Sequence, residues 1–362
     1  MKVLISGASV GGPVLAYWLR RQGAEVTVVE RAPAPRKGGQ AIDIRGAALT
    51  VADRMGILEQ ARALRTTMRG MSMVDGDGNE IMRSTEGTIS GGAFDSPDIE
   101  ILRDDLTALV ISAADAGYVY GDSIATLAQD AHGVDVTFES GRQARYDYVV
   151  GADGLHSTVR RLAFGPEERF LEHLGMYVSI FTAPNFLGLD HWQTWFREGD
   201  VGGAVFSDRD AGVMRVNLGF GAGPIDYDHR DVEQQKRLIQ EHCSGMRWEV
   251  PKLLAAMWAA DDFYFDAMAQ VKMDRWSAGR VTLVGDAGYC ATPLSGQGTS
   301  LAMVGAYVLA QELGSDPATA FDRYEQRMRP FVARNQALAV ENPGQGAAPE
   351  SVQLAANGIV LD

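Results

Sequence analysis

Cysteine is scarce in this sequence, with only Cys243 and Cys290 among 362 residues. The two lie far apart and in no metal-ligand spacing, which argues against a disulfide framework and against a zinc site or other bound metal. Long apolar runs are also missing, since none approaches the ~18 residues that a membrane-spanning helix needs. The amino terminus has one lysine and a short apolar run that ends in Gly-Ala-Ser, unlike a signal peptide. We therefore expect a cytoplasmic protein without a membrane span.

Positive charge is in deficit, because 33 lysines and arginines stand against 47 aspartates and glutamates, for a net charge of −14. This balance argues against nucleic acid or an anionic membrane surface as a partner. An anionic cofactor would have to be met by local arginines. The composition, 46% hydrophobic and 22% charged, is typical of a soluble globular enzyme, and the length suffices for two sizeable cores. We expect a monomer or weak homodimer that acts on a small molecule.

A glycine-rich turn near the amino terminus is the first candidate site. A short apolar strand over residues 3–5 leads into G-A-S-V-G-G at 7–12, a helical stretch over 14–22 and a second strand over 26–29. This order is the β-α-β dinucleotide unit, in which glycines let the backbone approach a pyrophosphate and an acid about 20 residues on binds ribose hydroxyls. The candidate contacts are Gly7, Ser9, Gly11, Gly12 and Glu30. Ser9 replaces the pattern's second glycine, so its β-carbon limits the approach of the pyrophosphate, although its hydroxyl could bond a phosphate oxygen.

The second candidate site follows an apolar strand over residues 281–284. Asp286 stands just past the carboxyl end of that strand, where α/β sheets place their ligands. A turn with Pro293, Gly296 and Gly298 then leads into a helical pattern over 297–313. A carboxylate can accept hydrogen bonds from ribityl hydroxyls, and the positive end of a helix favours an electron-rich ring edge, so a flavin satisfies both. The alternative is an ordinary Gly/Pro loop that caps a core helix.

A third acid stands at a strand end, where the strand over residues 146–150 continues into G-A-D-G with Asp153 and Gly154. The segment 31–45 is basic, and against the negative background it is a candidate anion site. Arg103 precedes a helical stretch to about residue 115 and could reach a cofactor phosphate or stack on a flat ring. The basic residues of segment 31–45 are Arg31, Arg36, Lys37 and Arg45. The alternatives are a solvated loop for Arg36 and Lys37, and a surface ion pair with Asp104 or Asp105 for Arg103.

Residues 168–276 differ in composition from the rest and indicate a substrate domain. Aromatic-rich segments that favour strands precede two helical patterns, over 231–243 and 251–260. We expect a mixed or antiparallel sheet, with most of its aromatics in the core and one alternating face forming the floor of a flat, apolar pocket. The candidate pocket residues are Trp192, Phe196, Met214, Phe220 and, from the glycine turn, Pro293. The sequence leaves open which face of the sheet is which.

With all three motifs in order, the chain resembles the single-component FAD-dependent aromatic hydroxylases of the para-hydroxybenzoate hydroxylase fold. Within that group it is most similar to polyketide hydroxylases and tetracycline-inactivating monooxygenases, over residues 1–340. The resemblance implies that Arg103 lies beside the flavin, and that Asp153 and Gly154 serve both FAD and the nicotinamide cofactor. It implies contacts with the ADP half of FAD from Gly7, Gly11, Gly12 and Glu30, and with its ribityl and isoalloxazine parts from Asp286, Pro293, Gly296 and Gly298. Besides Ser9, Tyr289 departs from the family pattern, since many members have histidine there.

The implied fold class is α/β, with a Rossmann-like FAD-binding domain of three layers (ββα) and an inserted substrate domain with a mixed or antiparallel sheet. The expected FAD-binding domain is discontinuous and comprises residues 1–70, 101–167 and 277–316. The expected substrate-binding domain comprises residues 71–100 and 168–276. A carboxyl-terminal helix and tail occupy residues 317–362.

The implied activity is that of a monooxygenase with non-covalent FAD. In such enzymes NADPH or NADH binds transiently and reduces the flavin, O2 adds to it, and the resulting hydroperoxide hydroxylates an electron-rich ring or enol. A polyketide or tetracycline-like antibiotic is a candidate substrate, and because the reactivity is flavin-centred we assign no catalytic acid or base. Two alternatives remain: a flavin-dependent reductase or dehydrogenase without oxygen insertion, and a non-catalytic protein that senses redox state through FAD.

Overall fold

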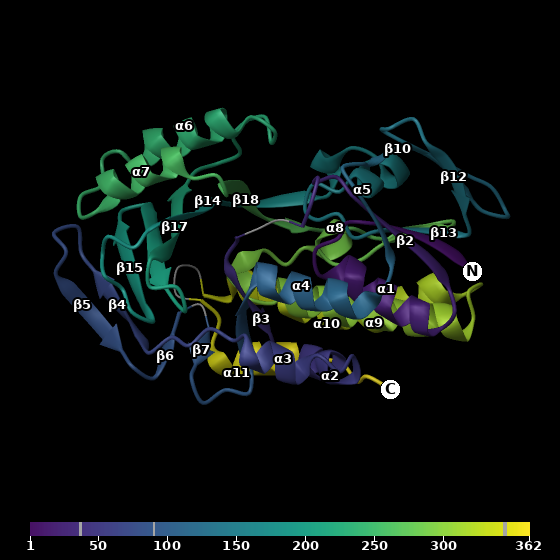
Figure 1. The fold of residues 1–362 in the computed structure, drawn as a ribbon, viewed down its shortest axis with the longest axis horizontal. Coiled ribbons are helices and arrows are strands. Elements are labelled where there is room, and N and C mark those ends of the chain that lie inside the picture. Colours follow the sequence, from purple (N-terminus) through teal and green to yellow (C-terminus); the bar gives the residue numbers. More distant parts are fainter. Residues whose placement is uncertain (36–37, 90, 343–345) are drawn as a thin grey trace.

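The computed structural model describes residues 1–35, 38–89, 91–342 and 346–362 (Figure 1). Its first sheet has six strands in the order β19-β20-β13-β1-β2-β9, and all neighbours are parallel except β19 and β20. The strands are β1 (Lys2–Ser6), β2 (Glu25–Glu30), β9 (Gly117–Tyr120), β13 (Tyr148–Gly151), β19 (Ser277–Ala278) and β20 (Val281–Leu283). Because the long neighbours are parallel, the carboxyl ends of β2, β1, β13 and β20 meet at one edge.

Both faces of the six-stranded sheet are covered. Three helices lie side by side on one face, and an antiparallel three-stranded sheet packs on the other (Figure 1). The covering helices are α1 (Gly11–Arg21), α4 (Arg103–Ala114) and α9 (Gly298–Ser315), and the covering strands are β10 (Ile124–Gln129), β11 (Val134–Phe138) and β12 (Gln143–Tyr146). Val3, Leu4 and Ile5 are fully buried between these layers, which is why β1 is a continuous apolar run. The predicted three-layer α/β fold is confirmed.

A second sheet of seven strands runs in the order β18-β14-β17-β16-β15-β4-β5, and only β15 and β4 are parallel neighbours. Helices α6 (Val232–Cys243) and α7 (Val250–Ala259) cover one of its faces, at the top of Figure 1, and enclose a separate apolar core. The strands are β4 (Gly70–Val74), β5 (Glu80–Ser84), β14 (Leu171–Pro184), β15 (Trp192–Glu198), β16 (Val201–Ser207), β17 (Val213–Gly221) and β18 (Tyr264–Val271).

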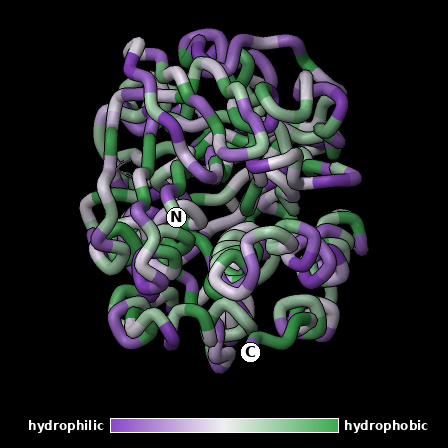
Figure 2. Tube along the Cα trace, turned by 90° about the vertical axis from the view of Figure 1, so that its right-hand side faces the viewer, coloured by the Kyte–Doolittle hydropathy of each residue, from purple (hydrophilic) through white to green (hydrophobic). Residues whose placement is uncertain are grey.

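A short antiparallel pair, β3 (Ala41–Ile44) with β8 (Ile99–Leu102), lies between the two sheets. Phe206 of the seven-stranded sheet packs there against Met68 and Leu102 in a small apolar cluster. The remaining elements are α2 (Ala47–Arg54), α3 (Leu58–Ala63), β6 (Gly87–Thr88), β7 (Gly92–Ala93), α5 (Thr158–Phe164), η1 (Glu167–Arg169), α8 (Asp286–Tyr289), η2 (Pro293–Ser295), α10 (Ala320–Glu341) and α11 (Pro349–Ala356). Hydrophilic segments gather at outer turns of the chain (Figure 2). In the described ranges, none of the helices has both the length and the apolar character needed to cross a bilayer.

The sequence did not reveal β3, β8, β9, β18 or α11. In β18 the reason is visible, because Asp266 and Gln270 occupy a face that is buried at 5% and 3% exposure but hydrogen bonded. Polar residues at buried positions hide the alternation by which a half-buried strand is recognised. Helix α11 packs against α10, where Asn335 Nδ2 donates to the Ala355 carbonyl over 3.1 Å.

The turn between β1 and α1 is a close crossing of backbone segments. Gly7 has a φ of +110°, which disfavours any other residue, and its N–H donates to the Val29 carbonyl over 2.8 Å. A β-carbon on Gly12 would lie 1.9 Å from the Gly7 carbonyl oxygen. A β-carbon on Gly11 would meet nothing nearer than Ala302 Cβ at 3.5 Å. A methyl group therefore fits at Gly11 but not at Gly12, although the two glycines are adjacent in one helix.

We expect Gly12→Ala to lower the free energy of unfolding by about 1–3 kcal/mol, because the backbone around Gly7 must move to accept the methyl group. Gly11→Ala is the matched control, with room for the methyl group and a gain in helix propensity. The measurement is urea unfolding of both apoproteins, followed by circular dichroism. Equal stabilities for the two variants would contradict the crossing described here.

Candidate cofactor and substrate site

Glu30 fastens the glycine turn to the end of β2. Its Oε2 accepts a hydrogen bond from the Ala8 N–H, and its Oε1 accepts one from the Ala32 N–H, each over 2.9 Å. Each carboxylate oxygen keeps a further acceptor position for a hydroxyl group. Arg31 is exposed beside it, whereas Arg36 and Lys37 lie outside the described residues.

Helix α1 begins at Gly11 with no acidic side chain in its first turn and no side-chain cap. Its first N–H groups are therefore oriented toward the edge where the strands end, with the positive end of the helix dipole. Ser9 is exposed just before this helix start. The turn thus fits an anionic group such as a pyrophosphate, and the serine hydroxyl stands on the accessible side.

Asp153 joins the ends of β1 and β13 to helix α5. Its carboxylate accepts hydrogen bonds from Ser157 Oγ, from the Val159 N–H over 3.1 Å and from Ser6 Oγ over 3.3 Å. Burial raises the pKa of this carboxyl, and the hydrogen bonds oppose that rise. Gly154 follows with a φ of +80°. These bonds give Asp153 a structural function, and its contact with a cofactor stays a prediction.

The predicted residues of the second motif converge on a small region. A β-carbon on Gly298 would lie 3.8 Å from Asp286 Oδ1, and a β-carbon on Gly296 would lie 3.8 Å from Arg45 Nη2. Burial raises the pKa of Asp286, while the Cys290 thiol, which donates to it, opposes the rise. The structure therefore brings together residues that are more than 200 positions apart in the sequence.

Arg45 is held by a neighbour that the sequence analysis did not single out. Its Nη2 lies 3.0 Å from Asp43 Oδ2, and both side chains are 10% exposed. Its backbone N–H donates to Ser300 Oγ of α9 over 2.9 Å. Burial raises the pKa of Asp43, although the charge of Arg45 opposes that rise. The only signal in the sequence was an acid and a base two positions apart, which share one face of a strand.

Gln297, at the start of α9, is fully buried at 0% exposure. Neither atom of its side-chain amide has a hydrogen-bond partner within the described ranges. A buried amide without partners is costly, so this one fits a bound group that offers both a donor and an acceptor. The pyrimidine edge of a flavin is such a group. Helix α9 has no acidic residue in its first turn, so its positive end adds to the fit.

Arg103 lies beneath the segment that enters β3. Its Nη2 donates to the Gly38 carbonyl and its N–H to the Gln40 carbonyl, each over 3.1 Å. The two aspartates that follow it have other partners: Asp104 accepts from the Gly38 N–H, and Asp105 pairs with Arg209 in the turn between β16 and β17. These contacts support the positioning of Arg103 near the cofactor segments rather than the surface ion pair.

Three of the five predicted pocket residues are misplaced. Phe196, Met214 and Phe220 are 4%, 0% and 1% exposed and lie in the core beneath α6 and α7. The prediction is wrong for them because these helices cover the face that the aromatics share. Trp192, on the same face, lies under the Arg83 guanidinium at 4.1 Å and donates to Ser72 Oγ. Pro293 is exposed at the start of η2.

The opposite face of the seven-stranded sheet meets the cofactor segments. Arg215 Nε donates to the Gly39 carbonyl over 2.9 Å, and Asn217 Oδ1 is buried without a hydrogen-bond partner in the described part of the chain. Tyr264 of β18 points the same way, since Phe265 beside it belongs to the core. This face is more polar than we expected from the sequence. The polar residues that alternate with the apolar ones along β17, such as Arg215 and Asn217, could have indicated it.

Comparison with known proteins decides the family. Residues 1–339 match the family model described as FAD binding domain. The chain belongs to this family of FAD-dependent monooxygenases. It is 42% identical over 342 residues, 94% of this chain and 88% of the other, to a "Flavin-dependent monooxygenase" of an unknown prokaryotic organism. A protein of the same name from Legionella longbeachae is 41% identical over 344 residues, with the same coverage.

Solved structures agree with this placement. The crystal structure of tetracycline destructase Tet(51) superposes on the monooxygenase with a TM-score of 0.91 and 36% identity, over 100% of this chain and 99% of that chain. Tetracycline destructase Tet(55) gives a TM-score of 0.89 and 38% identity, over 100% and 98%. The fold and the family predicted from the three motifs are therefore confirmed.

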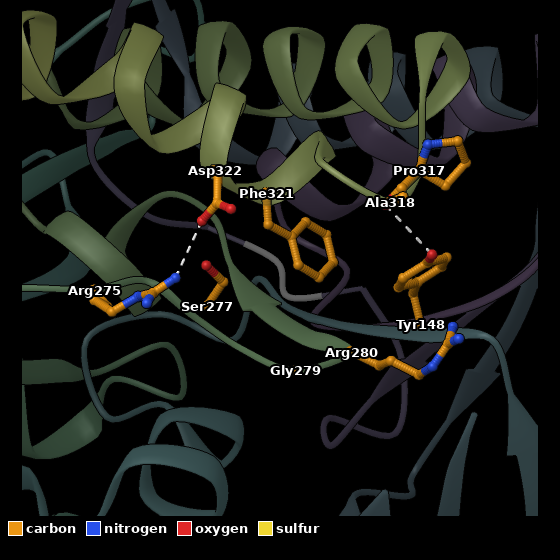
Figure 3. A pocket seen from close by; sticks show the side chains of 9 residues that line it. All are labelled: Tyr148, Arg275, Ser277, Gly279, Arg280, Pro317, Ala318, Phe321 and Asp322. Carbon is orange, nitrogen blue, oxygen red and sulfur yellow. Dashed lines mark hydrogen bonds and ion pairs between the residues drawn. The ribbon is translucent and has the colours of Figure 1, made fainter. Parts of the chain in front are cut away.

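A separate surface cavity of about 270 Å³ lies between the start of α10 and the sheet (Figure 3). It is lined by Tyr148, which begins β13, and by Arg280, which precedes β20. It therefore sits at the amino ends of the strands, opposite the edge where the monooxygenase gathers its acids and glycines. Its charged groups are engaged, since Arg275 pairs with Asp322 and Arg280 donates to the carbonyls of Ala131 and Asp147. We do not assign it to the cofactor.

We expect Asp286→Ala to weaken FAD binding about tenfold or more, because the loss of hydrogen bonds to a charged acceptor costs about 1.5–3 kcal/mol. The control is Asp322→Ala, which removes an exposed carboxylate at the cavity of Figure 3 and should leave the affinity unchanged. The measurement is a fluorescence titration of apoprotein with FAD. Wild-type affinity in Asp286→Ala would refute the assignment of this edge to the flavin.

Proposed function

We propose that this monooxygenase uses NADPH or NADH together with O2 to hydroxylate a flat, largely apolar phenolic or enolic molecule. Polyketides, and tetracyclines among them, are the first candidates. The observation that carries the proposal is the convergence of Asp286, Gln297 and Gly298 at the strand edge, facing a polar sheet surface. The similarity to tetracycline destructases over nearly the whole of both chains supports the choice of substrates.

FAD, when bound, supplies the redox chemistry, accepting a hydride from the nicotinamide and passing electrons to O2. The chain supplies binding and orientation. Glu30 and the turn at Gly7–Gly12 would hold the ADP part, and Asp286 would accept hydrogen bonds from ribityl hydroxyls. Gln297 and the first N–H groups of α9 would hold the ring edge and favour negative charge there. Arg45 and Arg103 would supply local positive charge in an acidic protein.

On the substrate side, the seven-stranded sheet would act as a wall that excludes water and presents polar groups to the oxygens of a phenol or enol. Arg215 and Asn217 offer a donor and an acceptor on that wall. The aromatic core behind it, beneath α6 and α7, gives the wall its rigidity.

We expect purified protein to be yellow and to release free FAD when it is denatured, because every residue assigned to the cofactor acts through hydrogen bonds or charge. The measurement is the flavin absorbance of the supernatant after precipitation. Flavin that stays with the precipitated chain would contradict non-covalent binding. Cys290, whose thiol donates to Asp286, would then be the first residue to examine.

We also expect phenols or polyketides to accelerate NAD(P)H oxidation, with tetracyclines tested first, and the product to carry one atom from labelled O2. A dehydrogenase would leave the label in water or peroxide, and a redox sensor would show no stimulated turnover. Acceleration by small aliphatic acids alone would rule out the proposed substrate class. Unlabelled product from every accelerating compound would rule out oxygen insertion.

A further inference from the structure

A hydrogen-bonded cluster of ionisable side chains links the candidate site to the surface. It lies between α5, η1 and β18, and none of its members is needed for the cofactor contacts described above. We call it the His156 cluster, and its members are His156, Glu167, His229, Tyr264 and Asp266.

Its members form a continuous chain of contacts. The Nδ1 of His156 lies 2.7 Å from Glu167 Oε1, and its Nε2 lies 3.1 Å from Asp266 Oδ1. The other oxygen of Asp266 accepts a hydrogen bond from the Tyr264 hydroxyl over 3.0 Å. These three links are within hydrogen-bonding distance, so protons can pass between Tyr264, Asp266, His156 and Glu167 without movement of the backbone, while His229 joins the cluster through a ring contact.

The inner end of the chain is Tyr264, on the face of β18 that lies against the loop after α8. Further along the same face, Met268 Sδ accepts from Thr292 Oγ1 over 3.5 Å, and Gln270 Nε2 donates to the Ala291 carbonyl over 3.3 Å. Tyr264 is 41% exposed, so part of its side chain is open to a bound molecule. Desolvation by neighbouring atoms and the carboxylates of Asp266 and Asp286 raise the pKa of Tyr264 well above its usual value, so it carries its proton at neutral pH.

The outer end of the chain is at the surface. The ring of His229, an exposed residue, lies 3.8 Å from the ring of His156, centroid to centroid. Burial and the neighbouring charge of His156 lower the pKa of His229, so at neutral pH its ring is predominantly unprotonated and can accept a proton from solvent. Glu167 is partly exposed and also pairs with the fully buried Arg160 over 2.7 Å.

The spacing of His156, Glu167 and His229 would also permit a metal ion, since their ligand atoms lie within 4.8 Å of one another. Both ring nitrogens of His156 face carboxylates, however, which favours the imidazolium. Burial opposes that charge, but the hydrogen bonds to Asp266 and Glu167 outweigh it and raise the pKa of His156 to about 9. At pH 7 a metal ion must displace this proton, which weakens binding about a hundredfold. The cluster is better suited to protons than to a cation.

We propose that Tyr264, Asp266 and His156 form a proton path between the cofactor-binding edge and solvent at Glu167 and His229. The proposal deepens the proposed function, on which it rests: NAD(P)H, H⁺, O2 and substrate give NAD(P)⁺, hydroxylated product and water, so one proton enters per turnover. Tyr264 releases its phenolic proton into the site and regains one from Asp266. His156 supplies Asp266 and is itself reprotonated from solvent.

The same path can be tested without a substrate, because reduction of bound FAD by two electrons also takes up one proton to give the anionic reduced form. In holoenzyme, the flavin is photoreduced with EDTA as electron donor in weakly buffered solution that contains a pH-indicator dye, and the protons released by oxidation of EDTA are subtracted with free FAD as the reference. Flavin absorbance reports the electrons, and the dye reports the proton. This test separates the proton path from the hydroxylation. Labelled product can be absent while proton uptake is normal, and proton uptake can be slow while labelled product still forms.

The decisive variant is Tyr264→Phe, and its matched control is Tyr227→Phe. Both keep the ring and remove one hydroxyl that faces Asp266, at 3.0 Å for Tyr264 and 3.4 Å for Tyr227. Tyr227 packs edge-on against Phe265 beside the α6–α7 core and against the ring of His229, so its hydroxyl contacts Asp266 without being one of the links of the proposed path. We expect Tyr264→Phe to slow proton uptake at least tenfold, and Tyr227→Phe to stay within twofold of wild type, with FAD affinity equal in all three.

A second variant, His156→Gln, should slow proton uptake similarly, and added imidazole should restore it. Imidazole should not rescue Tyr264→Phe, because the missing group there is at the inner end. A purely structural role for His156 would show no rescue. Wild-type proton uptake in Tyr264→Phe, equal slowing in both tyrosine variants, or failure of imidazole to rescue a folded His156→Gln would each overturn the proposal.

Discussion

The close contact between the glycine turn and the end of β13 is the constraint on which the rest of the site depends. A β-carbon on Gly7 would lie 2.2 Å from the Ala152 carbonyl oxygen, just as one on Gly12 would meet the Gly7 carbonyl. The absence of side chains there sets how near the ends of β1 and β13 approach each other. Asp153 then ties these ends to α5, and the adjacent β20 delivers Asp286 to the same edge. The close packing of the backbone therefore sets how the acids that end or follow β2, β13 and β20 are arranged along one edge of the sheet.

The cofactor side was largely predictable from the sequence, and the substrate side was not. The parallel strands are buried on both faces, so they appear as short apolar runs with a glycine or acid at the end, which local patterns reveal. The orientation of the second sheet depends on α6 and α7, which follow its aromatic strands in the sequence and fold back over them. The pattern of residues 192–220 alone does not indicate which face of the sheet these helices cover. Asp43, Gln297 and Tyr264 escaped notice for a related reason. Asp43 and Tyr264 each pair with a residue two positions away, and only the folded chain brings these pairs to the site, while Gln297 stands out because its buried amide has no partner in the described ranges.

Several basic side chains of this acidic protein are paired with carboxylates. Arg45 is matched with Asp43, Arg160 with Glu167, and His156 with two carboxylates. Such pairs cost desolvation and contribute little net stability when buried, so their presence near one edge is better explained by what they do to a bound group or a proton. The net charge of −14 is therefore a poor guide to the local potential where an anionic cofactor would lie.

In β17, even-numbered residues are buried and odd-numbered residues are partly exposed. Met214, Val216, Leu218 and Phe220 belong to the core, while the residues between them face the cofactor segments. Selection on what the enzyme accepts can therefore act on odd-numbered positions, and selection on folding can act on even-numbered ones, with little interference. Related enzymes can in this way differ in the substrates they accept while they keep the same stable core. Along β17, residues that vary with the substrate would then alternate with residues that are kept for folding.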